Sequence, residues 1–236
     1  NSHKILFVDC GLNHLIFLSN DNTVFTLGDN TYGQLGIGEA KDKLPYSFEP
    51  QKVDLPPIKQ VCSGYRFNIC VSDDGNVYFF GELKHTFDNS PQQIESLKDI
   101  DFVACGCDYA IYKSINNNIF IHGSNGSGQL GNGNTCYQNI PNICYGWPNN
   151  IVDIKCGQRH TLVLTSNQEV YSSGNNVNGQ LGFNTAQSAY VTVLTKIHYL
   201  SEIIRIECGS VHSMFIDINN DFYVFGSNRY GQLGLG

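Results

Sequence analysis

Five copies of one sequence pattern constrain this chain more than any other feature. In each copy a glycine near the start is followed by a second glycine 17 residues later, and the first glycines are Gly11, Gly64, Gly106, Gly157 and Gly209. The steps between copies are 53, 42, 51 and 52 residues. A fixed internal length with variable connections is typical of a repeat protein. We therefore expect residues 1–236 to form one repeat domain or a segment of one, with copies 1 to 5 at about 1–54, 55–98, 99–150, 151–200 and 201–236.

Short apolar runs within each copy predict β-strands. In copy 1 these runs are residues 4–10, 14–18 and 24–27, which are too short for helices. The last two flank Ser19-Asn20-Asp21-Asn22, whose Asn and Asp residues tolerate the positive φ of a tight turn. A fourth run follows the connection, as at residues 50–53, but copy 5 stops before one. Four short strands per repeat predict an all-β fold with the blades of a β-propeller, and a solenoid is the alternative architecture.

Composition limits the kinds of partner and the cellular compartment that we expect for this chain. The net charge of −7 argues against a nucleic-acid partner held by direct charge contact. No apolar run is long enough to span a membrane. Five of the nine cysteines occupy the one or two positions before the first glycine of a copy, namely Cys10, Cys62, Cys105, Cys156 and Cys208. This regularity predicts a slot for a small buried side chain rather than a disulfide framework or a zinc site, and hence a reducing compartment. We expect a cytoplasmic location, with the nucleus as the alternative.

The complete pattern is CG-x-x-H, a strand that ends in glycine, and then N-x-x-GQLG. Cys10–Gly36, Cys156–Gly182 and Cys208–Gly234 carry all of it, Cys105–Gly131 keeps GQLG without the histidine, and Ser63–Gly81 lacks GQLG. No Trp-Asp and no Gly-Gly dipeptide occurs, which argues against WD and kelch repeats. The pattern resembles the RCC1 (regulator of chromosome condensation) repeat, and the resemblance covers essentially the whole chain.

The resemblance implies a β-propeller, although members of that family have seven blades and five repeats are visible here. It also implies two alternative functions. The first is a non-catalytic protein–protein interaction propeller within a larger multidomain protein. The second is guanine-nucleotide exchange on a Ran-type small GTPase, the activity of the family's founding member, which uses a protruding hairpin. Because no long insertion interrupts the connections after GQLG, we favour the interaction module.

The repeated residues are expected to build the scaffold. Gly33 and Gly36 permit a tight turn, Leu35 fills an apolar gap between copies, and Gln34 satisfies backbone groups that the turn frees. The histidine slot, by contrast, is variable: its occupants are His14, Phe67, Tyr109, His160 and His212. A slot that accepts His, Phe or Tyr predicts packing rather than catalysis. The match of residues 126–131 to G-x-G-x-x-G opens no helix, so the repeat explains it without a dinucleotide.

Functional residues are expected where the sequence of one copy differs from that of the other copies. Copy 2 departs most, because Gly81 is followed by Glu-Leu-Lys-His-Thr-Phe instead of a GQLG loop. We take Lys84, His85 and Phe87 as partner-binding candidates there, with a decayed repeat as the alternative. Residues 132–150 contain the only tryptophan of the chain, so Tyr145 and Trp147 are further candidates, with packing on their own sheet as the alternative.

Catalytic motifs are missing from the sequence. No H-E-x-x-H, Walker loop or nucleophile elbow occurs, and no nucleophile, base and orienting group can be assembled. We therefore expect no catalytic residue, no cofactor and no metal, and no enzyme activity apart from the alternative of nucleotide exchange. The expected partner is another protein, with a small GTPase as one candidate.

Overall fold

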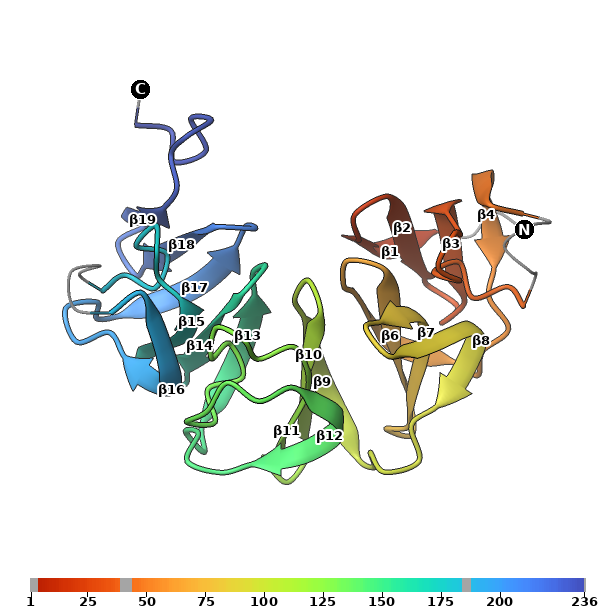
Figure 1. Cartoon of the computed structure of the whole chain (residues 1–236), viewed down its shortest axis with the longest axis horizontal. Helices are drawn as coiled ribbons and strands as arrows, with labels where there is room; N and C mark the ends of the chain where they lie inside the picture. The colour runs from red at the N-terminus through yellow and green to blue at the C-terminus, as the bar shows by residue number, and fades with distance from the viewer. Residues whose placement is uncertain (1–3, 39–43, 184–187, 236) are drawn as a thin grey trace. The chain divides into compact units, whose positions relative to one another are not determined.

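The structure, a computed structural model, describes residues 4–38, 44–183 and 188–235. All the regular structure in these residues is β, and it forms five antiparallel sheets (Figure 1). The all-β prediction is therefore confirmed. No helix capable of crossing a membrane occurs in this part of the chain.

Each of the five copies contributes one sheet. The first sheet contains β1 (Ile5–Cys10), β2 (His14–Ser19), β3 (Val24–Asp29) and β4 (Tyr46–Lys52). The second contains β5 (Ile58–Ser63), β6 (Phe67–Ser72), β7 (Val77–Leu83) and β8 (Thr86–Gln93). The third contains β9 (Ile100–Cys105), β10 (Tyr109–Ser114), β11 (Ile119–Gly123) and β12 (Gln138–Cys144). The fourth contains β13 (Ile151–Cys156), β14 (His160–Thr165), β15 (Val170–Asn175) and β16 (Tyr190–Lys196). The fifth has three strands, β17 (Ile203–Cys208), β18 (His212–Asp217) and β19 (Phe222–Gly226).

The chain divides into two compact units, Asn1–Asn118 and Ile119–Gly236. Unit 1 contains β1 to β10 and is coloured red to yellow-green in Figure 1. Unit 2 contains β11 to β19 and is coloured green to blue. Within every sheet the strands follow one another in chain order, so neighbouring strands are joined by local connections.

The hydrophobic core lies between neighbouring sheets. In unit 1, Ile16 and Val24 of the first sheet pack in one cluster with Ile58, Val61 and Phe80 of the second. In unit 2, a second cluster joins the fourth and fifth sheets and includes Leu162, Val170, Ile203, Ile206 and Phe215. Full burial of a side chain of this size stabilises the fold by about 1.5–3 kcal/mol. Each copy therefore depends on its neighbour for a complete core.

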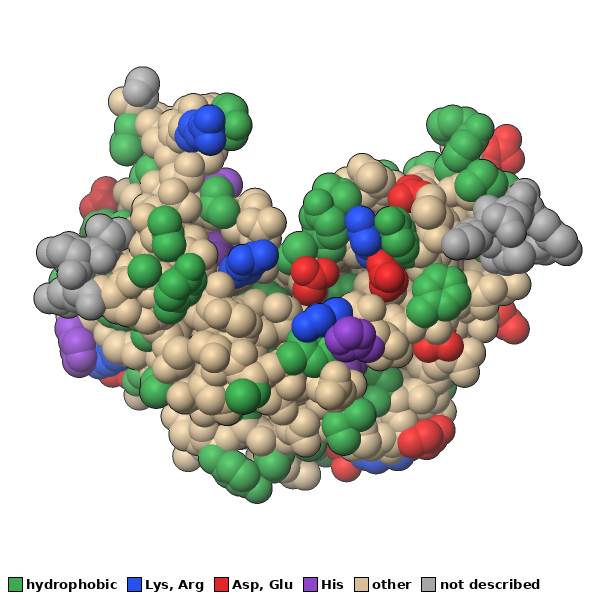
Figure 2. Space-filling model, in the orientation of Figure 1, with side chains coloured by type: hydrophobic (Ala, Val, Ile, Leu, Met, Phe, Trp, Pro, Cys, Tyr) green, Lys and Arg blue, Asp and Glu red, His purple; other side chains and the backbone are tan. Residues whose placement is uncertain are grey.

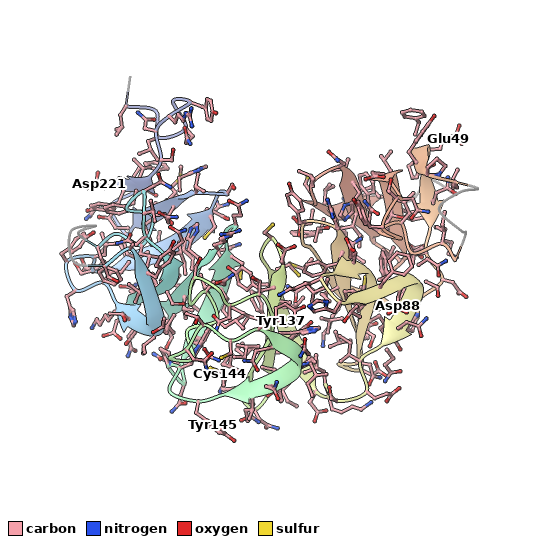
Figure 3. The ribbon with its side chains drawn as sticks, in the orientation of Figure 1. Glu49, Asp88, Tyr137, Cys144, Tyr145 and Asp221 are labelled. Atoms are coloured by element: carbon pink, nitrogen blue, oxygen red, sulfur yellow. The ribbon has the colours of Figure 1, made fainter. Side chains whose placement is uncertain are left out.

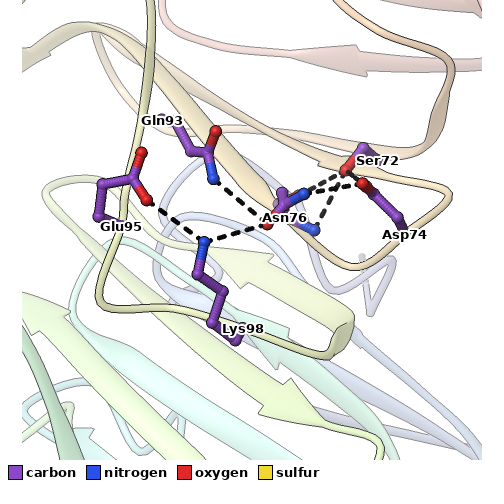
Figure 4. A network of polar contacts seen from close by, with 6 residues as sticks. All are labelled: Ser72, Asp74, Asn76, Gln93, Glu95 and Lys98. Atoms are coloured by element: carbon purple, nitrogen blue, oxygen red, sulfur yellow. Dashed lines mark hydrogen bonds and ion pairs between the residues drawn. The ribbon is translucent and has the colours of Figure 1, made fainter.

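Tight turns join the second and third strands of each sheet, as the sequence predicts. In each turn one residue has positive φ, and these residues are Asn22, Gly75, Asn117, Gln168 and Asn220. In copy 2, Asp74 accepts hydrogen bonds from Ser72 and Asn76, and the Asn76 side chain in turn accepts from Gln93 and Lys98 (Figure 4). This network ties the turn after β6 to the connection that follows β8.

The predicted burial of the cysteine slot is wrong. Cys10 is exposed, and Cys62, Cys105, Cys156 and Cys208 are only partly buried. These residues end the first strand of each sheet, which lies at the edge of the sheet. None of the nine cysteines, all of which lie in the described part of the chain, forms a disulfide. In the described part of the chain, no group of three or more His, Cys, Asp and Glu side chains is placed to hold a metal ion.

Candidate functional site

The GQLG loops hold themselves together with their own side chains. In copy 1 the Gln34 side-chain oxygen accepts a hydrogen bond of 2.8 Å from the Tyr32 backbone N–H, and Asn30 accepts one of 3.1 Å from that of Leu35. Copies 3, 4 and 5 repeat both bonds, the glutamines being Gln129, Gln180 and Gln232. The predicted role of the glutamine is therefore confirmed, and the asparagine plays the same role.

Each GQLG loop that has a copy after it is also bonded to that copy. The residue after the histidine slot donates a side-chain hydrogen bond to the glutamine carbonyl of the preceding loop, as in Asn68 to Gln34 at 2.8 Å, Thr161 to Gln129 at 2.7 Å and Ser213 to Gln180 at 2.7 Å. Copy 2 has no GQLG, and copy 3 has Ala110 at the donor position. The polar residue is present where its acceptor is present, which marks this bond as part of the scaffold.

The histidine slot holds a ring packed against a glycine. A Cβ atom on Gly11 would lie 2.0 Å from Cε1 of His14, and the same close approach recurs in every copy. The ring Nε2 of His14 lies 3.1 Å from Oδ1 of Asn68, and that of His160 lies 3.0 Å from Oγ of Ser213. Burial lowers the pKa of both rings, that of His160 to about 4, with His212 adding to the effect there. These rings are packing residues, as predicted.

Copy 2 has a tight hairpin at the position where the other copies have the GQLG loop. Leu83 of β7 pairs directly with Thr86 of β8, so Lys84 and His85 form the tip. Lys84 has φ of 55°, a left-handed conformation that a two-residue hairpin turn requires. Lys84, His85 and Phe87 are all exposed, Phe87 by 53%. The structure thus places these three predicted residues together on one hairpin.

Arg66 joins this hairpin to copy 1. Its Nη1 donates to Glu82 at 3.2 Å, and Glu82 is the cross-strand partner of Phe87. Its Cζ lies 3.9 Å from the ring centroid of Tyr32 and 5.8 Å from that of Tyr65. Burial alone lowers the pKa of Arg66, but the hydrogen bond to Glu82 and the two tyrosines raise it above its usual value. The guanidinium is therefore a cation that lies over the Tyr32 ring and within cation–π distance of the Tyr65 ring.

A pocket of about 270 Å³ opens beside Arg66, and we call it the Arg66 pocket. Residues of copies 1 and 2 line it, namely Leu12, Asn13, Asp29, Thr31, Tyr32, Gln34, Tyr65 and Arg66. Figure 2 shows cationic, acidic and hydrophobic side chains close together over β6 to β8 on the face drawn. We call Tyr32, Tyr65, Arg66, Lys84, His85 and Phe87 together the hairpin surface.

Tyr32, Tyr65 and Arg66 are not among the residues predicted from the sequence, although a comparison of copies contains the signal. At the junction of copies 4 and 5 the equivalent positions hold Asn178, Ser210 and Val211. At the junction of copies 3 and 4 they hold Ser127, Gln158 and Arg159. The frame therefore forms without the two aromatic rings or the cation, and their presence in copies 1 and 2 is not needed for folding the repeat.

The two aromatic candidates of copy 3 differ in exposure. Tyr145 is 80% exposed and points away from its sheet (Figure 3). Trp147 is only 7% exposed, because its indole packs near Gly131 of the GQLG loop, with Nε1 3.3 Å from the position of an added Cβ. Trp147 therefore packs within its own repeat, the alternative given above, and its side chain offers no surface anchor. Tyr145 remains a candidate separate from the hairpin surface.

Solved structures with the same fold cover nearly the whole chain. The structure of human WBSCR16 matches with a TM-score of 0.85 and 25% identity, over 98% of this chain and 64% of that one. Yeast RCC1 (Prp20), solved bound to Kap60, matches with a TM-score of 0.88 and 20% identity, over 100% of this chain and 59% of that one. The β-propeller fold is therefore confirmed. Because yeast RCC1 is only 20% identical to this chain, its similarity shows the fold alone.

Sequence relatives include receptors and ligases. The ultraviolet-B receptor UVR8 of Arabidopsis thaliana is 28% identical over 99% of this chain and 55% of the receptor. The probable E3 ubiquitin-protein ligases HERC6 and HERC4 of Homo sapiens are each 33% identical, over 88% and 98% of this chain but only 22% and 23% of the ligases. The chain thus spans about half of UVR8 and less than a quarter of the HERC proteins. Such relatives support a protein-interaction or regulatory propeller.

The family is shown by sequence profiles of the repeat itself. A profile described as regulator of chromosome condensation (RCC1) repeat matches residues 21–71, 116–164 and 167–216, which is more than half of the chain. A second profile of the same description matches residues 5–34, 151–180 and 203–232, each of which carries CG-x-x-H. This chain belongs to the RCC1 repeat family.

Proposed function

We propose that this chain is a non-catalytic protein-interaction propeller that binds its partner through the hairpin surface. The observation that carries the proposal is the replacement of the GQLG loop in copy 2 by the Lys84-His85 hairpin, next to an Arg66 that contacts two tyrosines. Scaffold residues are repeated in the other copies, whereas the Lys84-His85 hairpin is not, and Tyr32, Tyr65 and Arg66 occur together only at the junction of copies 1 and 2. We infer that these residues are present because they bind a partner, and not because the fold of the repeat needs them.

The chemistry of the hairpin surface fits a protein partner. Arginine and tyrosine are enriched among residues that dominate binding energy at protein interfaces. Phe87 adds exposed apolar area directly across the strand pair from Glu82. Lys84 and His85 add polar donors at the rim of the same surface, where charge affects association rate and specificity more than affinity.

Photo-crosslinking tests the proposal even while the partner is unidentified. A photoreactive phenylalanine analogue at Phe87 is compared with the same analogue at Phe48, which is 86% exposed on β4 and lies outside the hairpin surface. We expect a specific adduct from position 87 alone. The purified partner is then titrated against Phe87→Ala and Phe48→Ala, and about tenfold weaker binding is expected for the first only. Equal affinity for the two variants would contradict the proposal.

Nucleotide exchange on a Ran-type small GTPase is the alternative function. A solved structure of yeast Prp20p, described with its binding to Gsp1p and histones, is 20% identical and shows the fold alone. We expect no faster release of labelled GDP when this chain is added to such a GTPase at sub-stoichiometric concentration. Clear acceleration under these conditions would replace the non-catalytic proposal by the exchange activity.

A further inference from the structure

The guanidinium of Arg66 has hydrogen-bonding capacity that the described part of the chain does not use. A guanidinium carries five N–H donors, and here Nη1 donates to Glu82 while the buried Nε has no acceptor. No other acceptor among the described residues bonds this group. The flat fork of donors matches the geometry of a carboxylate better than that of any other side-chain group.

The acidic groups near Arg66 are already engaged by the loop of copy 1 and by the hairpin. Asp29 accepts from the backbone N–H and the hydroxyl of Thr31, and its second oxygen accepts from Gln34 at 3.1 Å. Glu82 is the ion-pair partner of Arg66 at 3.2 Å. Lys84, two residues beyond Glu82, adds a second cation at the hairpin tip. The two cations Arg66 and Lys84 are matched in number by the carboxylates of Asp29 and Glu82, which are occupied by these hydrogen bonds and by the ion pair.

Arg66 is also held in position before any partner arrives. Its contact with Tyr32, at 3.9 Å from Cζ to the ring centroid, restricts the side chain. Tyr32 is fixed in turn, because its backbone N–H bonds to the buried Gln34. The loop is held close to β8, since a Cβ on Gly33 would lie 2.8 Å from Cα of Asn89. A preorganised cation loses less conformational entropy on binding than a free surface arginine does.

We propose that the Arg66 pocket binds the carboxylate of one Asp or Glu side chain of the protein partner, with the tyrosines packing against its methylene groups. This rests on the proposed function and adds the chemical identity of one partner residue. The pocket volume of about 270 Å³ accommodates a single side chain and lies below the usual range of small-molecule and cofactor sites. The carboxylate accepts from Nη donors that Glu82 does not use, whereas the buried Nε lies out of a partner's reach.

A random peptide library displayed on phage supplies the probe. It is panned against the whole chain, each enriched peptide is then tested against the Arg66→Ala variant, and enriched peptides are synthesised in pairs that differ by Glu→Gln or Asp→Asn. We expect one fixed acidic position in the enriched peptides and about tenfold weaker binding of the amide member of each pair, because a charge-assisted bond to arginine is lost. Arg66→Lys is expected to recover only part of the affinity, since lysine lacks the planar fork.

Arg159 provides the matched control, because it occupies the same slot in copy 4 and is exposed without the two tyrosines. Arg159→Ala is expected to bind the peptides as the unchanged chain does. Peptides that need Lys84 or Phe87 but neither a carboxylate nor Arg66 would overturn the carboxylate pocket and leave the proposed function intact. No peptide selected at the hairpin surface in repeated pannings would count against both.

Discussion

The Ser213 hydroxyl donates a hydrogen bond of 2.7 Å to the backbone carbonyl of Gln180, which lies in the preceding copy. The ring Nε2 of His160 lies 3.0 Å from the same hydroxyl oxygen. A serine has one proton to donate and a carbonyl can only accept, so Nε2 of His160 must donate to Ser213. One buried side chain thereby connects the histidine slot of copy 4, the GQLG loop of copy 4 and the sheet of copy 5.

Ser213→Ala is expected to destabilise the chain without changing its fold. The substitution leaves the buried carbonyl of Gln180 and the N–H of His160 without this partner, which costs about 1–3 kcal/mol. Denaturant unfolding followed by circular dichroism measures the change. Thr195→Ala is the control, since its hydroxyl bonds on the exposed face of β16 and its loss should change the free energy of unfolding little. Equal losses for the two variants would contradict a connecting role for Ser213.

Acid is expected to destabilise unit 2 through two buried histidines. Burial is the main cause that lowers the pKa of both His122 and His160 to about 4, whereas an unfolded histidine titrates near 6.5. The unfolded state therefore binds more protons below pH 6.5, and stability falls as the pH decreases toward 4. Each histidine contributes a loss on the order of 2 kcal/mol between pH 7 and pH 5.

Phenylalanine variants test this pH dependence, because Phe80 and Phe67 fill the slots of His122 and His160 in copy 2. His122→Phe and His160→Phe remove a titrating group and keep a ring. The difference between unfolding free energies at pH 7 and pH 5 should shrink for each variant, even if its stability at pH 7 changes. An unchanged difference would show that these rings do not control the acid response.

The repeat frame was readable from the sequence because it depends on local chemistry. Turn residues with positive φ and the Asn and Gln of the N-x-x-GQLG loops act within a few residues of themselves, so their roles followed from the pattern. The exposure of Cys10 was not predictable in this way, since it depends on which strand lies at the sheet edge. The Arg66 pocket was missed for a similar reason. Tyr32 and Arg66 are 34 positions apart and meet only when copies 1 and 2 pack together.

Alanine substitutions at Gly36 and Gly234 distinguish the energetic cost of backbone strain from the cost of overpacking. Both have positive φ, at 65° and 67°, so alanine strains the backbone by about 1 kcal/mol at either position. At Gly36 a Cβ would also lie 2.6 Å from the ring of Phe80 in copy 2, whereas at Gly234 nothing described lies within 4 Å. Overpacking adds about 1–3 kcal/mol, so Gly36→Ala should lower the free energy of unfolding more than Gly234→Ala does. Equal effects would show that the loop of copy 1 moves away from Phe80 without cost.

Lys84→Gly distinguishes a partner-binding role of the hairpin tip from a structural one. Lys84 has φ of 55°, which glycine adopts without the Cβ penalty, and relief of this strain offsets the greater freedom of glycine in the unfolded chain. We therefore expect thermal unfolding to occur within a few degrees of that of the unchanged chain. If the hairpin surface binds the partner, the same variant should associate more slowly, with the largest difference at low salt, because a rim cation is lost.

Glycine at the exposed residue Asn178 of copy 4 serves as the control for the association rate, because that position lies in unit 2 and outside the hairpin surface. Slower association for Lys84→Gly alone, at unchanged stability, supports the hairpin as a binding element. A loss of stability with unchanged association would assign Lys84 to the fold instead.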